Sequence, residues 1–205
     1  MLNKPNNIPT CEEASCILQW AAAQNPGPWE AHSRVVGRAA ETIASACKLD
    51  GGTAYVLGLL HDVGRYEGVR DRHHVVAGYN LMRDKGYGRV ANICLSHSFP
   101  IKNIGVYSGK DDCTQEENAL IAHFLATAEY DAYDRLIQLC DSMCLAEGVC
   151  LLDVRLMDVT RRYGFNSFTL EKWNTVFALK THFDTLYGGN IYNLFYDEIR
   201  AASFR

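Results

Sequence analysis

The sequence predicts an all-α fold, a single-domain helical bundle of about nine to ten helices. Apolar residues recur at helical spacing along most of the chain, whereas alternation with a period of two is not sustained anywhere. Helix-start signals recur as well, and Gly or Pro breaks separate the helical segments. The 205 residues contain no internal repeat and no low-complexity linker, so we expect one domain over residues 1–205.

Local signals bound the predicted helices of the first half. Thr10-x-x-Glu13 is a capping box that starts the first helix. Residues 25–28, Asn-Pro-Gly-Pro, form a break that suits the start of the second helix. Residues 50–52, Asp-Gly-Gly, are expected to end that helical segment, and Asp71 is expected to cap the fourth helix. The predicted helices cover about 10–24, 29–48, 53–63, 71–85, and from 88 to a point before Pro100.

The second half is predicted to begin with a loop over residues 101–113, after a shorter loop over residues 64–70. Thr114-x-x-Glu117 is a second capping box, and the Gly188-Gly189-Asn190 break separates the last two helices. The predicted helices cover about 115–128, 131–146, 153–163, 169–187 and 191–201.

Composition excludes several classes of function. Hydrophobic residues make up 48% of the chain and charged residues 21%, which is typical of a soluble globular protein. The net charge of −4 and the lack of a Lys/Arg run argue against double-stranded nucleic acid as a partner. The sequence has no apolar stretch of membrane-spanning length and no signal-peptide pattern, so we expect a cytoplasmic protein without membrane association.

The eight cysteines include no Cys-x-x-Cys pair, and most lie in apolar helical patterns. We expect them to be buried free thiols rather than disulfides, because the chain carries no export signal. Cys140-x-x-x-Cys144 is the alternative, two ligands on one helix face.

His61-Asp62 is the most informative pair of residues. It follows the uncharged run 54–60 and precedes Val63-Gly64-Arg65. Burying an imidazole beside a carboxylate costs desolvation free energy, and a bound metal ion compensates that cost. A helix end in which His61 satisfies the last carbonyls and Asp62 is solvated explains the pair about equally well.

Three further histidines face inward on their predicted helices. His32 lies within the apolar stripe of its helix, His74 shares a face with Ala77 and Gly78, and His97 ends a stripe. The small Gly78 leaves room beside His74 for a metal ion or another helix. Core packing alone does not require so many imidazoles. Asp141 lies at the border of an apolar stripe, so the helical wheel leaves open whether it is a ligand or a semi-exposed surface carboxylate.

The ordered set His32, His61-Asp62 and Asp141 resembles the HD superfamily of metal-dependent phosphohydrolases. Three short motifs also look like the family: residues 59–65 (Leu-Leu-His-Asp-Val-Gly-Arg), residues 74–79 (His-x-x-x-Gly-Tyr) and residues 96–100 (Ser-His-Ser-Phe-Pro). The resemblance implies an HD-domain-like fold with a motif-bearing core over about residues 29–147. It does not cover the C-terminal helical extension, about residues 151–205.

The resemblance implies a dinuclear site. His32, His61, Asp62 and Asp141 would bind the first ion, and His74 and His97 would bind the second, with Asp62 bridging the two. A mixed His/carboxylate shell suits iron or manganese first, with zinc, cobalt, nickel and magnesium as alternatives. The adjacent His73 is the alternative ligand. We prefer His74, because Gly78 follows it by four residues, as in the family pattern. Ser98 stands where other two-metal members carry an additional histidine, which leaves an open position or a weaker second site.

The implied activity is hydrolysis of a phosphate ester, on a nucleotide or another small phosphorylated metabolite, by a metal-activated water. Asp62 and Arg65 are the candidate catalytic residues, and Arg65 and Lys102 are candidates for contact with substrate phosphate. Glu67 and Asp71 are candidate proton donors. Two alternatives remain: a metal-containing regulatory domain that binds a nucleotide or small ligand without turnover, and a diiron oxygenase on the same fold. The oligomeric state is left open.

Overall fold

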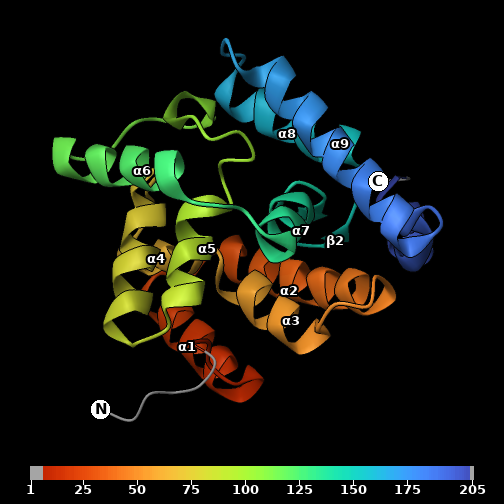
Figure 1. Cartoon of the computed structure of the whole chain (residues 1–205), viewed down its shortest axis with the longest axis horizontal. Helices are drawn as coiled ribbons and strands as arrows, with labels where there is room; N and C mark the ends of the chain where they lie inside the picture. The colour runs from red at the N-terminus through yellow and green to blue at the C-terminus, as the bar shows by residue number, and fades with distance from the viewer. Residues whose placement is uncertain (1–6, 204–205) are drawn as a thin grey trace.

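Helices make up nearly all of the ordered structure. The computed structural model describes residues 7–203, and within that range it contains ten α-helices, three short 3-10 helices (η) and one two-stranded hairpin (Figure 1). The elements are, in order, α1 (Cys11–Gln24), α2 (Pro28–Ala46), α3 (Gly51–Leu60), η1 (Val63–Glu67), α4 (His73–Asp84), α5 (Gly88–Ser96), η2 (Ile104–Val106), α6 (Gln115–Thr127), α7 (Ala132–Asp141), β1 (Cys144–Leu145), β2 (Gly148–Val149), α8 (Leu152–Tyr163), α9 (Thr169–Tyr187), η3 (Ile191–Phe195) and α10 (Tyr196–Ser203). The all-α prediction and the predicted number of helices are confirmed.

The main apolar core joins the N-terminal helices to the C-terminal extension. Val36 of α2, Leu57 of α3 and Ile137 of α7 are fully buried in it. Val176 and Phe183 of α9 belong to the same cluster, so α9 packs on the core that carries the histidines. A smaller cluster under α6 joins side chains of α4, α5 and α6. Figure 1 shows α8 and α9 lying over α7, on the side away from α1.

Two pairs of glycines set the spacing of the elements that carry the histidines. Gly37 of α2 faces Gly58 of α3, and a Cβ on Gly58 would lie 2.9 Å from the Gly37 Cα atom. Likewise, a Cβ on Gly64 of η1 would lie 2.3 Å from the backbone nitrogen of Gly78 in α4. Only glycine permits such close backbone approach. The space beside Gly78 is therefore filled by η1 and by Cys94.

Both predicted capping boxes are present, at the starts of α1 and α6. Residues 50–52 were predicted to separate the second helix from a third helix that begins at residue 53. This prediction is wrong, because α3 begins at Gly51. The Asp50 side chain accepts a hydrogen bond from the Thr53 backbone N–H at 2.6 Å. Asp50 is therefore the N-cap, and the two glycines form the first helical turn.

Asp71 does not cap α4, contrary to the prediction. The cap comes from the distant residue Asp112, whose carboxylate accepts hydrogen bonds from the backbone N–H groups of Asp71 and His73 at 2.9 and 2.8 Å. Burial acts to raise the pKa of the Asp112 carboxyl, but these backbone donors outweigh it and lower the pKa. The loop before α6 thus holds the start of the helix that carries His74.

We expect Asp112→Ala to lower the free energy of unfolding by about 1–2 kcal/mol, the cost of losing a helix N-cap. Urea denaturation at pH 7 measures the change. Asp84→Ala, which removes an exposed carboxylate from the other end of α4, is the matched control and should change stability little. Because the Asp112 pKa is lowered by folding, the difference between wild type and Asp112→Ala should shrink as the pH falls and the carboxylate is protonated. An equal loss in both variants would contradict the capping role.

The helix predicted over residues 131–146 ends earlier, at Asp141. Asp131 starts it as an N-cap, but β1 and β2 follow as an antiparallel hairpin that buries Met143, Cys144 and Val149. Glu198 of α10 accepts a hydrogen bond from the Val149 backbone N–H. Contacts from the core and from α10 therefore override local helix propensity in this segment.

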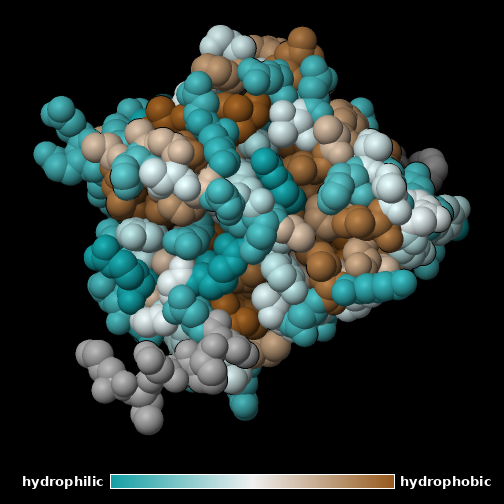
Figure 2. All heavy atoms as spheres, in the orientation of Figure 1, coloured by the Kyte–Doolittle hydropathy of each residue, from teal (hydrophilic) through white to brown (hydrophobic). Residues whose placement is uncertain are grey.

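No helix among residues 7–203 has the length and apolar character needed to cross a membrane. The face shown in Figure 2 carries polar side chains with apolar residues exposed between them.

Candidate metal centre

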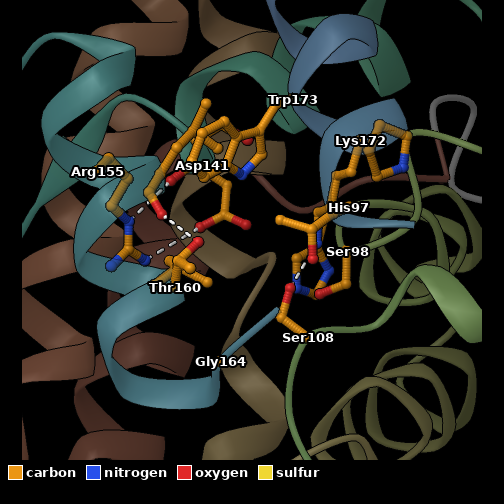
Figure 3. Close-up of a pocket in the computed structure, with 14 residues that line it drawn as sticks. His97, Ser98, Ser108, Asp141, Arg155, Thr160, Gly164, Lys172 and Trp173 are labelled. Atoms are coloured by element: carbon orange, nitrogen blue, oxygen red, sulfur yellow. Dashed lines mark hydrogen bonds and ion pairs between the residues drawn. The ribbon is translucent and has the colours of Figure 1, made fainter. Parts of the chain in front are cut away.

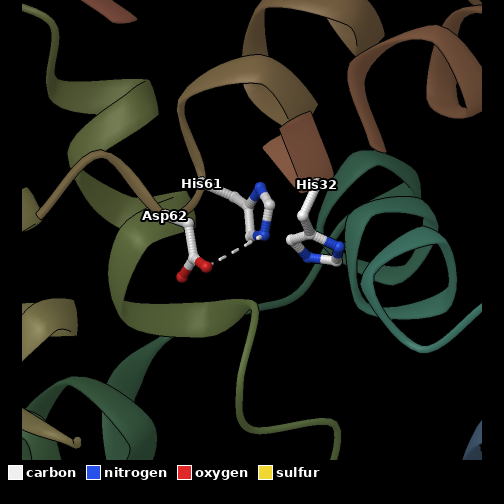
Figure 4. A group of neighbouring side chains, drawn as sticks. All are labelled: His32, His61 and Asp62. Atoms are coloured by element: carbon white, nitrogen blue, oxygen red, sulfur yellow. Dashed lines mark ion pairs between the residues drawn. The ribbon is translucent and has the colours of Figure 1, made fainter. Parts of the chain in front are cut away.

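Five elements bring six histidine and aspartate side chains to one point. His32 comes from the second turn of α2, and His61 and Asp62 follow the last turn of α3. The remaining three are His74 near the start of α4, His97 just after α5 and Asp141 at the end of α7. Within three overlapping groups of these residues, the candidate ligand atoms lie within 4.8 Å of one another. Figure 4 shows the imidazoles of His32 and His61 and the carboxylate of Asp62 directed toward the same space.

Asp62 lies at the centre of the cluster, and its two oxygens face different partners. Oδ1 lies 3.0 Å from His74 Nε2 and 3.4 Å from His97 Nε2. Oδ2 lies 3.9 Å from His61 Nε2 and accepts a hydrogen bond from Arg65 Nε at 2.6 Å. One oxygen of this carboxylate thus faces His74 and His97 while the other faces His61, which is the arrangement that a ligand shared by two ions requires.

Asp141 closes the opposite side of the cluster. Its Oδ1 lies 3.0 Å from His32 Nε2 and 3.8 Å from His61 Nε2. Its side chain remains 24% exposed, so it borders the opening of the site. Of the two alternatives that the helical wheel left open, this position favours the ligand, because the carboxylate faces the histidines.

Backbone carbonyls orient the imidazoles. His61 Nδ1 lies 2.7 Å from the Gly58 carbonyl oxygen, and His97 Nδ1 lies 3.2 Å from that of Ile93. His74 Nδ1 contacts the Asp71 carbonyl in the same way. Since a carbonyl only accepts, each Nδ1 carries the proton and each Nε2 presents its lone pair to the centre. Such outer contacts are those that fix metal-binding histidines.

Two of the ligand atoms that face the centre lack a hydrogen-bond partner within residues 7–203. His61 Nε2 and Asp62 Oδ1 are buried without a hydrogen-bond partner. The Nε2 atoms of His74 and His97, both acceptors in this tautomer, face each other at 3.4 Å. Leaving such groups unsatisfied costs free energy, which a cation coordinated between them would remove. The mixed imidazole and carboxylate donors fit divalent transition metals.

The site holds its side chains in the protonation states that metal binding needs. Burial lowers the pKa of His61 to about 4, so the imidazole is neutral at pH 7. Burial acts to raise the pKa of Asp62, but Arg65, His61 and His74 outweigh it and hold the pKa well below its usual range. Neutral imidazole and ionised carboxylate are the forms that bind metal ions.

The family model for the HD domain matches residues 29–145. The chain belongs to the HD domain family. This family corresponds to the superfamily of metal-dependent phosphohydrolases that the sequence resembles, and its domains bind divalent metals. No curated protein matches the chain, and no solved structure matches it.

Of the two adjacent histidines, the HD fold brings His74 to the centre and turns His73 away. The His73 ring nitrogens pair with Glu67 at 2.8 Å and with Glu117 at 3.1 Å. Cys113 is near enough to His73 and Glu117 for the three to hold an ion, but both nitrogens of His73 already have carboxylate partners. Glu67, a candidate proton donor, is likewise occupied by His73 and Tyr66.

The two candidates for phosphate contact differ in position. Arg65 lines the cavity beside the metal ligands while its Nε holds Asp62. Lys102 does not line this cavity, contrary to the expectation for it. Its ammonium donates to the Ala128 carbonyl and lies over the Tyr130 ring, because the chain turns away after Pro100 toward the end of α6. Lys102 is therefore a structural contact between loops.

The C-terminal extension supplies residues of the site that sequence reasoning missed. Arg155, Arg162 and Tyr163 of α8 and Lys172 of α9 line the cavity next to the candidate metal ligands. Arg155 Nη2 lies 3.8 Å from Asp141 Oδ1. No motif marks these residues, since they reach the centre only through packing of α8 and α9 on the core.

Proposed function

We propose that this HD domain protein hydrolyses phosphate esters, with two divalent metal ions held by His32, His61, Asp62, His74, His97 and Asp141. The proposal is carried by one observation: buried, unsatisfied metal-ligand atoms and several cationic side chains face the same cavity. Bound metal ions would lower the pKa of a coordinated water and neutralise charge on the phosphoryl group. Hydrolysis then forms a bond from the water oxygen to phosphorus while the ester P–O bond breaks, which releases an alcohol and inorganic phosphate.

The protein's own groups provide binding and orientation. Arg65 fixes Asp62 through its Nε and, because it also lines the cavity, presents a guanidinium edge to an anion. Arg155 and Arg162 add positive charge on the α8 side and are spaced from each other by Asp158, which pairs with both. Tyr107 lines the same cavity, and burial raises the pKa of its hydroxyl, which therefore stays protonated and can donate to a phosphate oxygen.

The test combines metal analysis with an activity screen. Protein purified without added metal should contain about two equivalents of iron, manganese or zinc. It should hydrolyse phosphomonoesters or nucleotides; a chelator should abolish the activity, and added Mn²⁺ or Fe²⁺ should restore it. Oxygen consumption is followed in the same samples.

Each outcome distinguishes the proposal from its alternatives. Metal and a phosphorylated ligand bound without turnover would identify a binding domain. Substrate-dependent oxygen consumption would identify an oxygenase. Failure to bind metal under any loading condition would contradict the assignment of the site.

A further inference from the structure

Three cavities follow one another through the site. An open cleft of about 490 Å³ is lined by residues that include Trp29, Arg162 and Tyr163. It shares Arg65 and Arg155 with a central cavity of about 100 Å³, which contains the metal-ligand residues Asp62, His74, His97 and Asp141. The central cavity shares residues that include His97, Ser98 and Lys172 with a third, more enclosed cavity of about 70 Å³. The site therefore has a wide entrance, a reactive middle and a narrow inner end.

Lys172 of α9 lies at the narrow inner end. Figure 3 shows it near His97, with Ser98, Ser108 and Asp141 around the same space. Its Nζ atom lies 3.5 Å from the Val106 carbonyl and 3.4 Å from the Ser108 hydroxyl, which are long contacts for an ammonium group.

Lys172 differs from the other cations of the central cavity in having no carboxylate partner. Arg65 pairs with Asp62, and both Arg155 and Arg162 pair with Asp158. Within residues 7–203, no carboxylate oxygen lies within 4.0 Å of the Lys172 ammonium. Burial lowers its pKa to about 8, so the group remains mostly protonated at pH 7. A partly buried ammonium without a carboxylate partner is stabilised by an anion brought by a ligand.

The size of the inner cavity limits that ligand. Pockets for drug-sized molecules measure about 300–1,000 Å³. The entrance cleft is within this range, whereas the inner cavity of about 70 Å³ holds only a few non-hydrogen atoms. The organic part of a substrate therefore fits the entrance, and only a small group fits beside Lys172.

We propose that the site is selective for phosphomonoesters and that Lys172 is the positioning residue that selects them. The inference rests on the proposed phosphohydrolase function. A monoester carries three non-bridging oxygens and a charge near −2, so one oxygen can face the Lys172 ammonium and the hydroxyls of Ser98 and Ser108. A diester has one charge fewer, and its second organic substituent would have to occupy the narrow end.

The test uses the metal-loaded protein with two matched probes, p-nitrophenyl phosphate and bis(p-nitrophenyl) phosphate. Wild type should hydrolyse the monoester with a kcat/KM at least about ten-fold above that for the diester. Lys172→Met should raise KM for the monoester about ten- to a hundred-fold, the range for one charged hydrogen bond, and should weaken inorganic phosphate binding in calorimetry by a similar factor. Its metal content should be unchanged, and Lys172→Arg should recover part of the loss.

Lys48→Met is the control, because it removes the same charge from an exposed position after α2. It should leave KM and phosphate affinity unchanged. Hydrolysis of the diester as fast as the monoester, or an unchanged monoester preference in Lys172→Met, would overturn this inference and leave the phosphohydrolase function standing. Hydrolysis of neither probe, together with no phosphate binding, would overturn both.

Discussion

Asp62→Ala is expected to remove both metal ions and to lower phosphoester turnover by at least about a thousand-fold. The physical reason is the central position of this one carboxylate. Oδ1 lies 3.0 Å from His74 Nε2 and Oδ2 lies 3.9 Å from His61 Nε2, so both halves of the site depend on it. It also holds Arg65 in place. Elemental analysis and steady-state kinetics measure the two effects.

The variant must be shown to fold, because Asp62→Ala leaves the Arg65 guanidinium without its carboxylate. Circular dichroism and thermal unfolding provide that check, and Asp62→Asn is a second variant that preserves the size of the side chain. Asp84→Ala, which removes an exposed carboxylate from α4, should retain full metal content and turnover. Full metal content and activity in a folded Asp62 variant would show that the metal site lies elsewhere.

The sequence places the candidate histidine ligands and Asp62 near one another because each of them leaves a local signal. His32 and His74 lie on apolar stripes, and His61-Asp62 interrupts an apolar run. Helical periodicity therefore places the histidines on the inner faces before any tertiary contact is known. Asp141 has only a boundary position on its helix, and the packing of α7 beside α2 and α3 was needed to place it.

The substrate side of the site could not be predicted in the same way. Arg155 and Lys172 follow the matched family region, and on a helical wheel they resemble ordinary surface cations. Their roles arise from the docking of α8 and α9 on the main core. The prediction that Lys102 contacts phosphate was wrong because it rested only on closeness in sequence to His97. That closeness does not determine the path of the chain after Pro100.

The errors in the predicted secondary structure also arise from contacts between segments that are distant in sequence. Local signals placed the capping boxes at Thr10 and Thr114 correctly, because each box is complete within four residues. The cap of α4 comes from Asp112, about forty residues away, and β1 and β2 replace a helix because the core holds Val149. The periodicity of apolar residues carries no information about interactions between distant segments.

His74→Ala is expected to remove one of the two ions selectively. His74 and His97 lie close to Asp62 Oδ1, whereas His32 lies close to Asp141 on the other side of the site. The proposed ligands of one ion therefore have only Asp62 in common with those of the other. Metal content should fall from about two equivalents toward one, and affinity for the remaining ion should change little. Turnover should fall by about a hundred-fold or more, since a single ion no longer clamps the phosphoryl group from both sides.

The adjacent residue provides the control. His73→Ala removes an imidazole one position away, but that imidazole pairs with Glu67 and Glu117 outside the centre. It should leave metal content and turnover near those of wild type. Equal loss of both ions in His74→Ala would mean that the two sites bind cooperatively as one unit. Metal content of one equivalent in wild type, unchanged in His74→Ala, would instead establish a mononuclear centre at His32, His61, Asp62 and Asp141 with His74 in a structural role.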